Sequence, residues 1–271
     1  MTEKNKVILF CGLVLLIAVV VSFFKFPALL AAYMFIPALV TLIMLFLVTK
    51  DGLKKESWKQ IGLGINLKFL IYAFFIPFVV LILSYFIATK INSGYFLGLP
   101  DGKELKPINS LFFILMMAAL QTITVSLGEE LGWRGYLLPK LLNLTSNKLS
   151  AYLITGMVWA IWHFPVIFIA KSYNTEGNLF YTTSLFVVVV LVVSIIIGEL
   201  KMKSKSIWTA SLFHSAHNTV WGFLTPLFVT TGPIIYLTGE SGIITIALYS
   251  LVAFLLLWIN KGKPTSRPKL L

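Results

Sequence analysis

The sequence predicts an all-α integral membrane protein in which eight transmembrane helices form a single domain over residues 1–271. Of the 271 residues, 58% are hydrophobic and 12% are charged, and the mean hydropathy is +0.92. Long apolar runs alternate with short basic clusters along the whole chain. An ordinary soluble domain does not have this composition. The single cysteine, Cys11, excludes an internal disulfide.

Eight apolar runs have about the 20 residues that a helix needs to cross a bilayer. They cover residues 7–24, 27–48, 69–89, 110–138, 150–170, 179–200, 207–228 and 243–259. The first run follows two lysines, as in a signal peptide, but no small-residue cleavage pattern comes after it and the second run begins at once. We therefore expect a helical hairpin that turns near Pro27. The basic stretch 49–68 is expected to lie along the membrane surface.

Basic residues indicate which side of the membrane carries the termini. With eight spans, the side of the termini holds 16 Lys and Arg residues against five on the other side. The positive-inside rule therefore predicts that both termini are cytoplasmic. We expect a multi-pass protein of a bacterial cell membrane. The net charge of +12 is interpreted as topology signals and contacts with membrane lipid, and nucleic acid is not expected as a partner. The oligomeric state is left open.

Three charged residues stand inside the run 110–138, where ionisable side chains are costly and point to function. Glu130 and Arg134 are i,i+4 neighbours on one helix face, so we expect an ion pair between them. Glu129 lies about 100° further round and requires a partner from another helix. Gly128 and Gly132 are expected to let a neighbouring backbone come close.

All three histidines also fall inside apolar runs. His163 precedes Pro165, which removes a backbone hydrogen bond and predicts a local bend. His214 and Asn218 are i,i+4 and share a helix face, whereas His217 could share it or face a neighbouring helix. A single histidine in a span is commonly a hydrogen-bonding helix contact. Three of three make a common polar site the better interpretation.

Depth supports one site. At 1.5 Å per residue, Glu129 lies roughly 13 Å from the cytoplasmic end of its helix, His214 roughly 10 Å and His163 roughly 20 Å. These depths predict a site between the midplane and the cytoplasmic face, open to cytoplasmic water.

A carboxylate, imidazoles and an amide at one depth are suited to hydrolysis. A buried glutamate can serve as general base for water, while imidazole and amide N–H groups stabilise an oxyanion. The same residues leave a metal mechanism open, with zinc held by Glu129, His163, His214 and His217. No H-E-x-x-H pattern is present, and no serine or cysteine stands in a typical nucleophile setting.

Three short motifs follow one another on three of the predicted spans. They are Glu129-Glu130-x-x-x-Arg134, Trp159-x-x-x-His163 and His214-x-x-x-Asn218. In this order they resemble the CAAX protease and bacteriocin-processing family of intramembrane proteases, which includes the type II CAAX prenyl endopeptidases. The resemblance covers residues 121–221, within a motif-bearing core of about 109–228, and the first three spans match in hydropathy alone.

The resemblance implies a role for each motif residue. Glu129 matches the catalytic glutamate, and His163 the histidine that orients and activates the water. His214 and Asn218 match the pair that stabilises the oxyanion. The supporting polar pair is matched by Glu130 and Arg134. Trp159 replaces a common phenylalanine, which we interpret as harmless, and His217 has no motif role.

The sequence therefore predicts an intramembrane endopeptidase that cuts a hydrophobic, lipidated or bacteriocin-like peptide near the cytoplasmic face. The glutamate-activated water requires no cofactor, although a zinc-dependent version stays open. A prenylated CAAX protein is not the expected substrate. Two alternatives remain: a non-catalytic membrane immunity or scaffold protein, and a proton-coupled transporter, which would also use buried Glu, Arg and His. A binding protein should tolerate Glu129→Gln.

Overall fold

The protein is an all-helical bundle. The computed structural model describes residues 1–91, 96–98, 107–174, 176–228 and 234–261, and in these ranges the only β-type pairing is an isolated bridge between Phe96 and Phe228. The helices are α1 (Glu3–Phe24), α2 (Pro27–Ala31), η1 (Tyr33–Phe35), α3 (Ile36–Leu42), η2 (Ile43–Val48), η3 (Asp51–Leu53), α4 (Lys55–Ile61), α5 (Leu67–Lys90), α6 (Pro107–Ile123), α7 (Val125–Glu130), η5 (Leu131–Leu137), α8 (Leu138–Leu144), α9 (Lys148–Phe164), η6 (Pro165–Ala170), α10 (Leu179–Ser204), α11 (Ile207–Leu224), η7 (Thr225–Leu227), α12 (Ile234–Leu237) and α13 (Ile243–Ile259).

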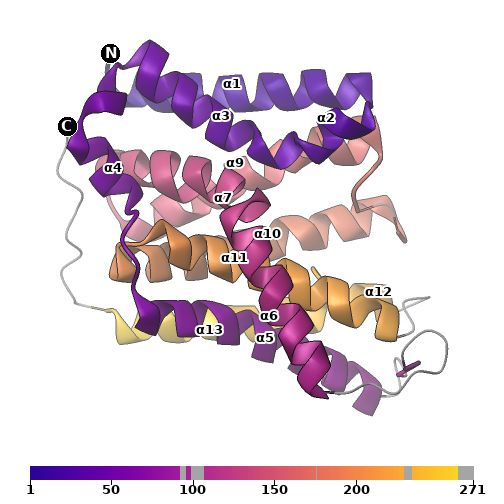
Figure 1. Cartoon of the computed structure of the whole chain (residues 1–271). Helices are drawn as coiled ribbons and strands as arrows, with labels where there is room; N and C mark the ends of the chain where they lie inside the picture. Colours follow the sequence, from indigo (N-terminus) through magenta and orange to yellow (C-terminus); the bar gives the residue numbers. More distant parts are fainter. Residues whose placement is uncertain (92–95, 99–106, 175, 229–233, 262–271) are drawn as a thin grey trace.

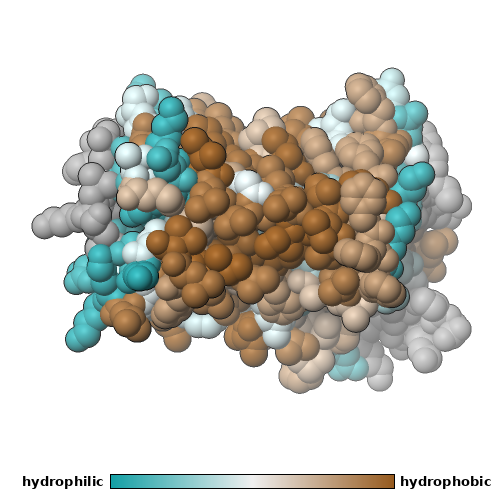
Figure 2. Space-filling view, turned by 90° about the horizontal axis from the view of Figure 1, so that it is seen from above, coloured by the Kyte–Doolittle hydropathy of each residue, from teal (hydrophilic) through white to brown (hydrophobic). Residues whose placement is uncertain are grey.

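Most of the long helices run between the same two ends of the bundle, with α6 crossing them obliquely (Figure 1). The N-terminus and the end of α13 lie at one end, which we name the terminal end, and the turn after α1 lies at the other, the distal end (Figure 1). Seen from above, a broad band of hydrophobic side chains separates two hydrophilic ends (Figure 2). Such a band is what a bilayer requires of a spanning bundle.

Within the described residues, five helices are long and apolar enough to cross a membrane, and two further apolar helices are shorter. The five cover Glu3–Phe24, Leu67–Lys90, Ile108–Leu144, Lys148–Ala170 and Leu179–Ser204, and the shorter two Tyr33–Val48 and Ile243–Ile259. All eight apolar runs of the sequence are thus mainly helical where they are described. The remaining run, 207–228, forms α11, which carries the polar residues His214, Ser215, His217 and Asn218 that lower its hydropathy.

The local sequence explains where these helices begin and end. Thr2 caps α1 by accepting a 3.2 Å hydrogen bond from the Asn5 amide, and Asn178 caps α10 in the same way through the amides of Phe180 and Tyr181. Lysines in the left-handed conformation end three helical segments, at Lys25, Lys171 and Lys205. The hairpin predicted near Pro27 is present, because Lys25 ends α1 and Pro27 opens α2.

The fourth predicted span departs from a straight helix. Thr124, with φ −120° and ψ −105°, separates α6 from α7, and residues Leu131–Leu137 form wider π-type turns. The close approach predicted at the two glycines is confirmed. A Cβ on Gly128 would lie 2.9 Å from the Met34 carbonyl oxygen, and one on Gly132 would lie 2.4 Å from the Pro37 Cβ. Small residues here allow α3 to pack directly against α7 and η5.

Candidate active site

A buried ion pair stands at the junction of α7 and η5. Arg134 Nη1 lies 2.9 Å from Glu130 Oε1, and neither residue is exposed. The ion pair predicted from their spacing is therefore present. The Arg134 guanidinium also stacks on the Trp159 ring of α9, with Cζ 4.5 Å from the ring centroid. Three elements are thus joined at this point by one arginine and its contacts.

The Glu129 side chain accepts hydrogen bonds from two tryptophans and none from Arg134. The indole Nε1–H of Trp159 donates to Glu129 Oε2 over 2.7 Å, and that of Trp133 donates to the same oxygen over 3.4 Å. The residue is 3% exposed. The predicted partner on another helix is therefore an indole of α9. These bonds hold one carboxylate oxygen and leave Oε1 toward His214, whose Nε2 lies 3.9 Å away.

His163 is held in one tautomer by its own helix. Its Nδ1 lies 2.9 Å from the Trp159 carbonyl oxygen, which can only accept, so Nδ1 carries the proton. Nε2 of the neutral ring then carries a lone pair. The ring packs against Tyr173 and Phe186, with centroids 5.4 and 4.9 Å away. Instead of a simple bend, Pro165 marks the change from the α-helix α9 to the π-type turns of η6.

His214 connects the two glutamates from α11. Its Nδ1 lies 3.0 Å from Glu130 Oε1, the oxygen that also accepts from Arg134. Because a carboxylate accepts, this Nδ1 carries a proton, and Nε2 can donate only when the ring is an imidazolium. Glu129, Glu130, Arg134 and a charged His214 together have a net charge of zero. The four side chains thus form a compact network in which charges balance.

One cavity of about 130 Å³ joins the predicted residues. We name it the site cavity. Its walls include all four predicted catalytic residues and also His217, whose Nδ1 lies 2.8 Å from the Tyr249 hydroxyl. Asn218 makes no side-chain hydrogen bond to any described residue, so its amide is free to meet a ligand. The apolar wall of the site cavity comes from Met34, Phe186, Val189, Val190 and Val193.

The sequence missed three residues that also line this cavity, Tyr173, Trp221 and Glu240. Tyr173 donates a hydrogen bond from its hydroxyl to Glu240, and both lie in connections between helices. Burial raises the pKa of Glu240 to about 7, although the Tyr173 hydrogen bond opposes this. The only signal in the sequence was an isolated glutamate just before the last apolar run, which is too weak to single out a site residue.

The residues lining the site cavity extend toward the distal end, which differs from the expected opening at the terminal end. Tyr173 follows η6, Trp221 lies near the end of α11, and Glu240 precedes α13. The expected depth of Glu129 is counted from Leu138 at about 1.5 Å per residue, the rise of a regular α-helix. Because Leu131–Leu137 form π-type turns, that rise does not hold between Glu129 and the terminal end.

The zinc alternative finds no matching geometry. Among the residues that the structure describes, no group of three or more His, Cys, Asp or Glu side chains is placed to hold one metal ion. Glu129, His163, His214 and His217 line one cavity but do not converge as a ligand set.

Comparison with known proteins identifies the motif-bearing region. Residues 110–220 match the family model of the Rce1-like type II CAAX prenyl endopeptidases. A segment of 106 residues is 37% identical to CAAX prenyl protease 2 of Methanococcus maripaludis, covering 38% of this chain and 36% of the relative. Over residues 110–220 the chain is thus similar to the type II CAAX prenyl endopeptidases, which are part of the CAAX protease and bacteriocin-processing family. This similarity confirms the resemblance seen in the three motifs and, together with the apolar helices, indicates an integral membrane protein. The chain spans little more than a third of the length of that CAAX protease relative.

Proposed function

We propose that this protein is an intramembrane endopeptidase that hydrolyses a peptide bond in a hydrophobic, lipidated or bacteriocin-like peptide with a water activated by glutamate and histidine. The observation that carries the proposal is the site cavity, where Glu129, His163, His214 and Asn218 face one space of about 130 Å³. The family match over residues 110–220 adds independent support for a protease.

The first chemical step uses Glu129 and His163. Water held between the free Glu129 oxygen and the lone pair of His163 Nε2 attacks the carbonyl carbon of the scissile bond. A carbon–oxygen bond forms, the water proton passes to the Glu129 carboxylate, and the carbonyl oxygen becomes an oxyanion. The hydrogen bond from Trp159 keeps the carboxylate pointed at the cavity.

The oxyanion is stabilised from α11. Asn218 supplies an amide N–H, and His214 supplies Nε2–H in its imidazolium form, which Glu130 and Glu129 stabilise by their negative charge. When the carbon–nitrogen bond breaks, Glu129 returns the proton to the leaving amine. The apolar wall of the cavity receives a hydrophobic side chain next to the scissile bond.

The test compares wild type with Glu129→Gln on a hydrophobic peptide and on its farnesylated form, with products read by mass spectrometry. Glu56→Gln is the matched control, because Glu56 is exposed at the terminal end and the chemical change is the same. We expect cleavage by wild type and Glu56→Gln and none by Glu129→Gln. Equal binding by all three proteins without cleavage would favour the scaffold alternative, and proton-driven uptake of the peptide into vesicles would favour the transporter.

We also propose that eight helices cross the membrane with both termini cytoplasmic. Seven apolar helices and α11 run between the two hydrophilic ends, and the basic residues are concentrated on the side of the termini. Reporter fusions after Thr145 and after Ser172 should locate on opposite sides of the membrane. The same side for both fusions would contradict this topology.

A further inference from the structure

A second cavity, of about 300 Å³, adjoins the site cavity at the distal end. We name it the distal cavity. The two cavities have three lining residues in common, Tyr173, Trp221 and Glu240. These shared side chains form the boundary between the two spaces. A ligand in the distal cavity would therefore lie directly beside the residues that face Glu129.

Every element that lines the distal cavity contributes its distal end. Tyr85 lies near the end of α5 and Thr182 near the start of α10. Thr225 directly follows α11, and Ser241 lies just before α13. Because neighbouring helices run in opposite directions, these positions are far apart in sequence and meet only at one face of the bundle. The cavity thus belongs to the side of the membrane opposite the termini.

Among the described residues, packing closes the terminal side of Glu129. Trp133, Arg134 and Leu137 follow Glu129 along the chain toward the terminal end, and all three are fully buried. A cavity of about 20 Å³ at the terminal end shares none of its described lining residues with the site cavity.

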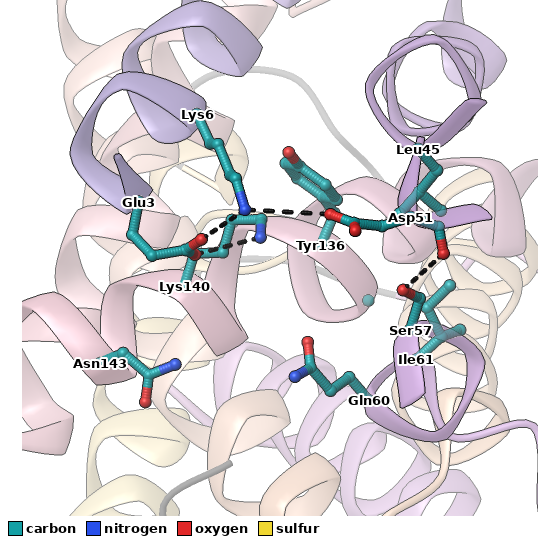
Figure 3. A pocket seen from close by; sticks show the side chains of 11 residues that line it. Glu3, Lys6, Leu45, Asp51, Ser57, Gln60, Ile61, Tyr136, Lys140 and Asn143 are labelled. Atoms are coloured by element: carbon teal, nitrogen blue, oxygen red, sulfur yellow. Dashed lines mark hydrogen bonds and ion pairs between the residues drawn. The ribbon is translucent and has the colours of Figure 1, made fainter. Parts of the chain in front are cut away.

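Ion pairs hold that end together. Figure 3 shows Glu3 between Lys6 and Lys140, and Lys6 reaching Asp51, with nitrogen–oxygen distances of 2.7, 3.2 and 3.9 Å. The pairs join α1, α8 and η3 across the small cavity, so they fasten three elements where a terminal entrance would have to open.

We infer that the distal cavity is the entrance to the site and the binding site for the polar peptide segment beside the scissile bond, so that substrate reaches Glu129 from the membrane side opposite both termini. The inference rests on the proposed function for the identity of the ligand. The lining offers hydroxyls, an amide and the carboxylates of Glu176 and Glu240, with no Lys or Arg among its described residues. A neutral or cationic peptide segment fits this lining, whereas a free C-terminal carboxylate is repelled.

Tyr173 and Glu240 narrow the connection between the distal cavity and the site cavity. The Tyr173 hydroxyl donates to Glu240 across the boundary, and the Tyr173 ring packs against His163. A peptide that passes from the distal cavity to Glu129 must therefore lie against this pair. Its backbone N–H groups can bond to Glu240, which places the segment next to the imidazole that holds the water.

Thiol labelling tests the route without any need for activity. In a Cys11→Ser background, Val189→Cys places a thiol in the site cavity and Ser241→Cys places one in the distal cavity. Ser146→Cys, exposed after α8, is the matched control at the terminal end. A small, membrane-impermeant, cationic methanethiosulfonate is added to one face of oriented vesicles at a time.

We expect the Val189→Cys and Ser241→Cys thiols to react about tenfold or more faster from the face opposite to the one that labels Ser146→Cys, since a thiol reacts only where the reagent reaches it. The inference would be overturned if the Val189→Cys and Ser241→Cys thiols reacted faster from the face that labels Ser146→Cys, or equally fast from both faces. Labelling of Ser241→Cys without Val189→Cys would show that the cavities do not communicate. Val193→Cys also places a thiol in the site cavity and replaces Val189→Cys if that variant fails to fold.

A second measurement separates this inference from the proposed function. A bulky maleimide on Ser241→Cys should abolish peptide cleavage, while the same maleimide on Ser146→Cys should leave it unchanged. Cleavage that survives full modification of Ser241→Cys contradicts the entrance. No cleavage by unmodified protein contradicts the protease, and the labelling rates still decide the route.

Discussion

The indole N–H of Trp159 donates a 2.7 Å hydrogen bond to Glu129, so a side chain of α9 orients the carboxylate of α7. The same ring carries the Arg134 guanidinium on its face. A phenylalanine, the common residue at this motif position, could provide the face but has no N–H. The tryptophan is therefore more than the harmless replacement that the sequence indicates.

Trp159→Phe should lower kcat while the protein stays folded. A hydrogen bond to a charged group contributes about 1.5–3 kcal/mol, which corresponds to roughly tenfold to a hundredfold in rate if it serves only to orient the base. Trp133→Phe is the matched control, because its N–H lies 3.4 Å from the same oxygen and should matter less. Peptide cleavage and thermal unfolding are measured on both variants. A larger loss of rate in Trp133→Phe would refute the assignment.

Arg134→Ala should reduce stability far more than Glu129→Gln. The substitution leaves the Glu130 carboxylate buried without its arginine, at a cost of about 3–5 kcal/mol by analogy with other buried pairs. The double variant Arg134→Met with Glu130→Gln should recover much of the loss, because Nε and Nη2 of Arg134 have no partner among the described residues and the charge then disappears. Thermal unfolding in detergent measures this. Equal melting temperatures of wild type, Arg134→Ala and Glu129→Gln would contradict the division of roles.

Local spacing predicted the parts of the site that lie within one helix. The i,i+4 rule gave the Glu130–Arg134 pair, and the glycine pair gave the close approach of α3. Hydropathy located the helical runs. These features depend on residues a few positions apart, which is the range that helix geometry controls.

Features that depend on tertiary packing could not be predicted in this way. The break at Thr124 has no proline or glycine to mark it. Tyr173 and Glu240 come from separate connections that only the folded bundle brings together. The structure places Glu129, His163, His214 and Asn218 around one cavity. Their catalytic roles stay predictions.

Asn218→Ala should reduce kcat by roughly 10²–10³ with little change in KM, because an oxyanion donor acts on the transition state. The Asn218 amide has no side-chain partner in the described structure, so its removal should not disturb packing. Asn218→Asp keeps the size and removes the donor, and it should be at least as slow. Kinetics on the hydrophobic peptide measure both variants. An unchanged kcat with a raised KM would assign Asn218 to substrate binding instead.

Cleavage should survive exhaustive chelation, and His217→Ala should be the mildest of the three histidine substitutions. His163 and His214 face the proposed water and oxyanion, whereas His217 bonds to Tyr249 at the edge of the cavity. Tyr249→Phe, which removes that bond alone, should behave like His217→Ala. Rates are measured after chelation and after added zinc, together with metal content. Stoichiometric zinc lost in His217→Ala would establish the zinc mechanism.

Glu240 should make the protein less stable as pH rises from about 4.5 to about 7. Burial raises its pKa from 4.5 to about 7, so in this interval the unfolded chain releases a proton that the folded protein retains. The stabilising contribution is complete below pH 4.5 and is lost as pH passes 7. Glu240→Gln cannot titrate, so its melting temperature should match wild type near pH 4.5 and exceed it above pH 7. The corresponding difference in the free energy of unfolding is roughly 3 kcal/mol at most.

The control for this titration is Glu176→Gln, which removes an exposed carboxylate of the same cavity. Because the expected effect belongs to Glu240, this substitution should leave the difference between low and high pH as in wild type. Melting curves of the three proteins between pH 4 and pH 8 supply the measurement. If the wild type and Glu240→Gln curves stay parallel over that range, Glu240 is hydrated in solution and the Tyr173–Glu240 boundary is open to water.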